Sequence, residues 1–195
     1  MAGRWFGLGL VLALGCGSST PSGSSGKFCS SDDYTNLPMS LTFSKQPCSY
    51  TAAQVAAGIV FTYQEVIEEA WSLRPIPQDL GGCQTPDDAG LIVGYKITGG
   101  GQSYCRCDVG LCAAQSFATT SVIGTHDRTV SWDGRNWNGP SDTNTAEGSS
   151  FPPGSYAVTL TATGTYSATT DGGAIDSGVS PTFGIGATFP FTITP

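Results

Sequence analysis

The sequence predicts an all-β fold, a β-sandwich of about seven short strands. Segments rich in β-branched and aromatic residues recur along the chain, and glycine- and proline-rich turns separate them. Charged residues make up only 12% of the chain while glycine reaches 27 residues, which is typical of a turn-rich β protein. Apolar residues at 39% and aromatic residues at 10% suffice for a packed core and exclude a disordered chain.

The clearest strand is predicted at 156–162, where Tyr156, Val158 and Leu160 alternate with smaller or polar residues. Residues 51–73 are ambiguous, because helix-favouring alanines and glutamates lie beside an alternating apolar pattern. We favour a strand at 58–68 there and leave a helix open. Further segments of strand composition lie at about 37–46, 91–98, 104–107, 122–132 and 183–194.

Prolines indicate two interruptions of this pattern. Residues 74–90 contain three prolines and three glycines, so we expect them to form a loop. Pro190 lies inside the last predicted strand and predicts an edge position or a bulge, because proline cannot donate a hydrogen bond to a sheet.

The first residues predict export from the cytoplasm. Residues 1–15 contain one basic residue, Arg4, followed by an apolar run from Trp5 to Leu14. A helix needs about 20 apolar residues to cross a bilayer, so this run is too short to span one. It has the length of the hydrophobic region of a signal peptide.

The run ends at Leu12-Ala13-Leu14-Gly15-Cys16, which resembles the lipobox of bacterial lipoproteins. The resemblance implies that Cys16 carries a lipid, although that family favours leucine and a small residue where this chain has Ala13 and Leu14. Residues 16–27 then form a flexible Ser/Gly-rich tether. The resemblance associates an aspartate after the cysteine with retention in the inner membrane; this chain has Gly17 there, so the resemblance implies the outer membrane. Ordinary secretion with cleavage nearby is the alternative.

Six cysteines follow Cys16, and export makes three disulfides the expected arrangement. The candidates are Cys29, Cys48, Cys83, Cys105, Cys107 and Cys112. Cys29 and Cys48 are a plausible local pair. The cluster at 105–112 could instead hold zinc, but its spacing differs from that of structural zinc sites. We therefore predict no metal and no cofactor.

Residues 129–160 contain two short motifs, Trp-Asp-Gly-Arg from Trp132 and Pro-Pro-Gly-Ser-Tyr ending at Tyr156. They resemble the hairpin of a group of bacterial immunoglobulin-like domains. That group includes the intracellular proteinase inhibitor fold, part of the flagellar hook-capping protein and sorting domains of surface proteins. The resemblance covers residues 129–160 alone and implies an immunoglobulin-like β-sandwich. Together with the cysteines, it leads us to expect one disulfide-stapled domain over residues 28–195.

Physical chemistry supports this hairpin in four respects. Val130 and Trp132 are two residues apart on a predicted strand, so both can point into a core. Gly134 can adopt a positive φ in a turn. Pro153-Gly154 suits the centre of a type II turn. The Tyr156 hydroxyl can donate back to nearby backbone as a tyrosine corner.

The loop from Trp137 to Ser150 is longer than the link in the family. Trp137 and Asn138 form a possible recognition loop, since aromatic residues on loops often contact partners. The alternative is that Trp137 covers the end of the sandwich.

No set of residues predicts catalysis. His126-Asp127 is the one place where a histidine-based acid and base could begin, but no nucleophile motif accompanies it. Glu65, Glu68 and Glu69 could supply paired carboxylates, yet a solvated strand end or helix face is the simpler interpretation. Two acidic segments lack the spacing of a calcium loop, Asp32-Asp33 and the stretch from Asp171 to Asp176.

These observations predict a non-enzymatic lipoprotein of the cell envelope that acts as an interaction or assembly module. Its expected partners are the membrane, through the lipid anchor, and an envelope protein or polysaccharide. A net charge of −7 with no basic run makes nucleic acid a poor partner. The alternative is a secreted or envelope-bound protease inhibitor, by analogy of fold alone. An envelope hydrolase rests only on the scattered carboxylates.

Overall fold

The computed structural model describes residues 32–34, 39–77, 84–105, 116–137, 147–168 and 181–195. These residues form thirteen strands and a single five-residue helix, so the predicted all-β class is confirmed. The strands are more numerous than the seven expected, because several contain only two to four residues. No helix among the described residues has the length and apolar character needed to cross a membrane.

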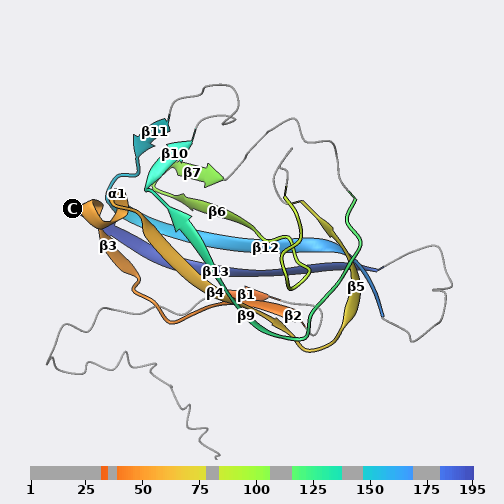
Figure 1. The fold of residues 1–195 in the computed structure, drawn as a ribbon. Coiled ribbons are helices and arrows are strands. Elements are labelled where there is room, and N and C mark those ends of the chain that lie inside the picture. The colour runs from red at the N-terminus through yellow and green to blue at the C-terminus, as the bar shows by residue number, and fades with distance from the viewer. Residues whose placement is uncertain (1–31, 35–38, 78–83, 106–115, 138–146, 169–180) are drawn as a thin grey trace, which may run out of the picture.

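Eight of these strands form one large sheet. Its long central pair is β12 (Gly154–Ala168) and β13 (Thr182–Thr194), which run antiparallel along most of their length (Figure 1). β6 (Gly94–Gly99) and β5 (Trp71–Ile76) pair with successive halves of β12. The remaining strands of this sheet are β1 (Asp32–Tyr34), β3 (Ser49–Thr51), β7 (Gln102–Cys105) and β8 (Thr119–Thr120).

A second, antiparallel sheet has three strands, β2 (Met39–Phe43), β4 (Ile59–Ile67) and β9 (Gly124–Trp132), with β4 in the centre. Alternate residues of β4 and β2 are buried. On β4, the ring of Phe61 lies 5.2 Å from that of Phe191 and 6.3 Å from that of Phe189, both on β13. The two sheets therefore pack through an aromatic layer.

Two short elements complete the fold. β10 (Arg135–Trp137) and β11 (Glu147–Ser150) form a two-stranded sheet of their own. Helix α1 (Ala52–Ala56) is capped by Thr51, whose side-chain oxygen accepts from the Gln54 backbone amide while the Thr51 backbone amide donates to Gln54 Oε1. This capping box explains the mixed signal at 51–73, because one helical turn directly precedes the predicted strand.

The expected loop at 74–90 is wrong at its start, since β5 continues through Pro75 to Ile76. β5 pairs with β12 along its whole length, but its pairing with β8 reaches only Ser72 and Leu73. The missing amide of Pro75 therefore needs no partner on the β8 side. The strand expected at 91–98 also begins later, at Gly94.

Pro190 is tolerated within β13 for the same reason, the lack of a partner strand on one side in the described part of the chain. On one side it pairs with Ala157 of β12. On the other side, β1 pairs with residues 186–188 and β3 with residues 192–194. Among the described residues Pro190 thus lies between two partner strands, a local edge inside a central strand.

The two hairpin motifs meet at a corner held by a ring contact and a hydrogen bond, which we call the closed corner. Trp132 is buried and its ring lies 4.8 Å from that of Phe151. The Tyr156 hydroxyl donates to the Pro152 carbonyl at 2.7 Å, which is the predicted tyrosine corner. Gly134 has the expected positive φ, 76°. The type II turn at Pro153-Gly154 is wrong, since Gly154 lacks a positive φ and instead begins β12.

The cysteine predictions are tested only at one position. Cys48 is buried and disulfide-bonded. The side chains of Cys29, Cys83, Cys105, Cys107 and Cys112 lie outside the described part of the chain, so the expected pairing and the count of three bridges stay predictions. The signal peptide at 1–15 and the tether at 16–27 also lie outside it.

Replacing Tyr156 with phenylalanine removes the corner hydrogen bond and leaves the Pro152 carbonyl without this donor. We expect the free energy of unfolding to fall by about 1 kcal/mol, measured by urea denaturation. Tyr104→Phe is the matched control and should change it by less than about 0.5 kcal/mol, because this partly buried tyrosine contributes through its ring contacts. Equal effects of the two variants would contradict the corner.

Replacing Gly134 with alanine should lower the free energy of unfolding by more than about 1 kcal/mol. Its φ of 76° disfavours a side chain, and an added Cβ would lie 2.2 Å from Val55 Cγ1, so α1 would have to shift. Gly184→Ala is the control, because a Cβ there meets nothing within 4 Å. A stable Gly134→Ala variant would show that this turn is not constrained.

Candidate functional site

Several residues proposed from the sequence lie where no site can be described. Cys16, Asn138 and the acidic stretch from Asp171 to Asp176 are outside the described residues. Trp137 ends β10, and its side chain is also outside the description. Asp32 and Asp33 lie on β1, where they pair with Thr188 and Ala187 of β13.

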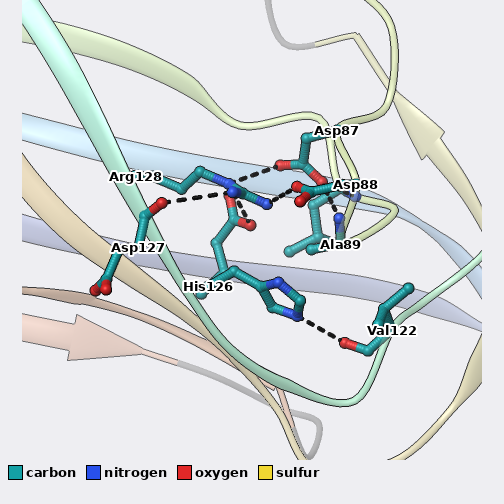
Figure 2. A network of polar contacts seen from close by, with 9 residues as sticks. Asp87, Asp88, Ala89, Val122, His126, Asp127 and Arg128 are labelled. Carbon is teal, nitrogen blue, oxygen red and sulfur yellow. Dashed lines mark hydrogen bonds and ion pairs between the residues drawn. The ribbon is translucent and has the colours of Figure 1, made fainter.

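His126 and Asp127 do not form an acid–base pair. As neighbours on β9 they point to opposite faces of the sheet. Asp127 accepts a hydrogen bond from Gln64 Nε2 at 3.0 Å on the exposed face, whereas His126 Nε2 lies 2.9 Å from the Val122 carbonyl oxygen. Figure 2 shows the two side chains diverging in this way.

Glu65 corrects the expectation of a solvated strand end. It is 0% exposed, whereas Glu68 and Glu69, beyond the end of β4, are exposed. The alternation of β4 explains this, since Ile59, Phe61, Tyr63, Glu65 and Ile67 all point inward. The three glutamates therefore do not form a carboxylate pair.

Arg128 of β9 is the partner of the buried carboxylate. Arg128 Nε lies 3.0 Å from Glu65 Oε2 and 3.6 Å from Asp87 Oδ2. Its Nη2 pairs with Asp88 Oδ1. One guanidinium thus contacts three carboxyl groups. Two of them, Asp87 and Asp88, belong to the loop that precedes β6 (Figure 2). Within the described part of the chain, the other oxygen of Glu65, Oε1, has no hydrogen-bond partner.

Asp87 also folds its own loop. Its Oδ1 accepts from the backbone amides of Ala89 at 2.9 Å and Leu91 at 3.0 Å, and its amide donates to the Leu91 carbonyl. Gly90, at a φ of 90°, completes the tight bend. The Ala89 carbonyl accepts from the Val122 amide at 3.2 Å. The segment 87–91, which we call the acidic loop, is therefore held to β9 and to the residues just before it.

Burial and charge together alter the titration of this cluster. Burial, and then the nearby Asp87 carboxylate, raise the pKa of Glu65 to about 8, although Arg128 offsets part of the shift. Burial, followed by the charges of Glu65 and Asp87, raises the pKa of Tyr63 above its ordinary value. Burial lowers the pKa of Arg128, but the three carboxylates outweigh this and raise it overall. The raised pKa of Glu65 therefore extends its protonated form to higher pH than in an ordinary glutamate.

The arrangement can hold a proton, but it offers no access to a substrate at Glu65, which is fully buried. Among the described residues, no three His, Cys, Asp or Glu side chains form a group that could bind a metal ion. Sequence reasoning missed Arg128, Asp87 and Asp88. One feature of the sequence could have indicated the cluster, because Glu65 is the single charged residue among the inward-facing positions of β4.

Arg128→Met should lower the free energy of unfolding by about 1 kcal/mol at neutral pH, because Glu65 loses a hydrogen-bond donor and the partly exposed Asp87 and Asp88 lose their cation. Arg74→Met is the control, since Arg74 is exposed on β5 and its replacement should cost less than about 0.5 kcal/mol. Urea denaturation of both variants tests this. Indistinguishable midpoints would show that the cluster contributes nothing to stability.

No family model, curated protein or solved structure matches this chain in the three comparisons made.

Proposed function

We propose that this protein is a lipid-anchored module of the bacterial cell envelope that acts by binding and not by catalysis. The observation that carries the proposal is the closed corner in which Tyr156 donates to the Pro152 carbonyl. It supports the resemblance of residues 129–160 to immunoglobulin-like domains, a group that includes proteins of cell surfaces and surface appendages. We propose an immunoglobulin-like arrangement of the two packed sheets on the same ground.

The start of the chain supports the location. A short apolar run ends at Cys16, and a Ser/Gly-rich tether follows. A lipid on Cys16 would hold the folded part near the membrane while the tether gives it freedom to reach a partner. The buried, disulfide-bonded Cys48 is consistent with an oxidising compartment.

The proposed recognition surface is the loop that begins at Trp137 and Asn138. It connects β10 to β11, two strands that, among the described residues, pair with each other and with no strand of the other two sheets. A long loop held at both ends by paired strands is a common way to display binding residues on a rigid scaffold. The expected partner is an envelope protein or polysaccharide.

The anchor is tested by phase partition of the full chain in a detergent that separates lipidated from free protein. We expect the chain in the detergent phase, with mass spectrometry placing the acyl groups on Cys16. The Cys16→Ala variant should move to the aqueous phase. A wild-type chain that is aqueous and cleaved elsewhere would contradict the anchor and favour secretion.

The binding role is tested with a photocrosslinking residue placed at Asn138 in intact cells. We expect a reproducible adduct with one envelope component. The same crosslinker at Glu68, which is exposed at the end of β4, is the control and should give no such adduct. Equal adducts from both positions, or none from Asn138, would contradict the proposed surface.

A further inference from the structure

The cluster around Arg128 contains more negative groups than its single cation can balance. Glu65, Asp87 and Asp88 all contact this guanidinium. Glu65 and Asp87 approach the same atom, Nε, so their carboxyl groups lie close together. If all three were ionised, the cluster would carry an excess of two negative charges next to the core. A proton on one carboxyl relieves part of this repulsion.

We propose that Glu65 is the proton-holding member of a latch, and that loss of its proton loosens the acidic loop 87–91 from β9. With its proton, Glu65 still accepts from Arg128 Nε but adds no negative charge, so the charge of the guanidinium is balanced by Asp87 and Asp88. Once ionised, Glu65 competes with both aspartates for the one guanidinium and repels Asp87.

The loop moves because Glu65 cannot. Glu65 lies on the central strand of its sheet, paired on both sides, and its side chain is 0% exposed. The side chains of Asp87 and Asp88 are 28% and 77% exposed and belong to a loop. Solvating the two aspartates therefore disturbs less structure than withdrawing Glu65 from the interior.

The groups that face Glu65 come from every element around it. On β4 the neighbouring inward group is Tyr63, and on β9 the facing groups are His126 and Arg128. Opposite Glu65 on β2 lies the apolar Leu41. The acidic loop contributes Asp87 and Asp88. Arg128 is the single arginine or lysine among these groups, so it alone is permanently cationic and can compensate an ionised Glu65.

Loosening the acidic loop would also affect a second segment, the residues just before β9. The Val122 amide donates to the Ala89 carbonyl, and the Val122 carbonyl lies against His126 (Figure 2). Val122 and Ile123 are 49% and 60% exposed, and they are two of the four large apolar side chains that are exposed in the described structure. The latch therefore controls how rigidly this apolar pair is presented.

The direction of the pH effect follows from the raised pKa of Glu65. A loosened loop admits water, so the pKa of Glu65 falls back toward its ordinary value of 4.5. The latched state is then favoured at acid pH and loses its advantage as pH rises from about 4.5 to about 8. Above this range the opening no longer increases.

Hydrogen exchange on the purified full chain tests the latch. After correction for the intrinsic pH dependence of exchange, protection of peptides covering 87–91 should fall at least about tenfold between about pH 5.5 and pH 8. In Glu65→Gln, which mimics the protonated carboxyl, the change should stay within about twofold. Glu68→Gln, which alters an exposed carboxylate outside the cluster, should behave like the wild type.

Three results would overturn the proposal. Protection that is constant in the wild type would show that no latch opens. A tenfold change that persists in Glu65→Gln would assign the effect to another group. A loss of protection in β13 peptides as large as that in the 87–91 peptides would indicate global unfolding. If Glu65→Gln does not fold, ¹³C NMR of the wild type replaces it: the Glu65 carboxyl must lose its proton over the same pH range in which the 87–91 peptides lose protection, and a carboxyl ionised throughout that range would overturn the proposal.

Discussion

Side chains on β4 point alternately inward and outward, and this alternation is the constraint on which the rest of the site depends. Phe61 must point inward, because its ring joins the two sheets through Phe189 and Phe191. A strand repeats every two residues, so the same register carries Glu65 into the interior four positions later. A buried carboxyl needs a partner. Arg128, one strand away on β9, supplies it and in turn binds the loop that covers this end of the sheet.

Much of the fold could be predicted because it depends on local patterns. The strands at β4, β9 and β12, the buried Trp132 and the tyrosine corner were all visible as alternation or as short motifs. The errors occurred where pairing decides the outcome. Pro75 is tolerated in β5 only because no partner occupies one side at that point, and Gly154 becomes the first residue of a strand instead of a turn. Neither outcome could be predicted from the neighbouring residues.

The site was harder to predict because its members lie far apart in the chain. Glu65 and Arg128 are 63 residues apart, and Asp87 and Asp88 belong to a segment that reads simply as loop. Glu65 resembles Glu68 and Glu69 in type, and only its position in the alternation separates it from them. The envelope location, the lipid on Cys16 and the binding role rest on the sequence and on the hairpin, so they remain proposals. The protease-inhibitor alternative rests on analogy of fold alone and stays a prediction.

We infer that β4 holds a protonated carboxyl, that of Glu65, in the interior of the protein. The most direct measurement is a titration of the Glu65 side-chain carboxyl by ¹³C NMR in the full chain, assigned with the Glu65→Gln variant. The account predicts a midpoint near pH 8, because burial and the Asp87 carboxylate oppose ionisation. A midpoint near the ordinary value of 4.5 would contradict it, and would show that Arg128 compensates an ionised Glu65 completely.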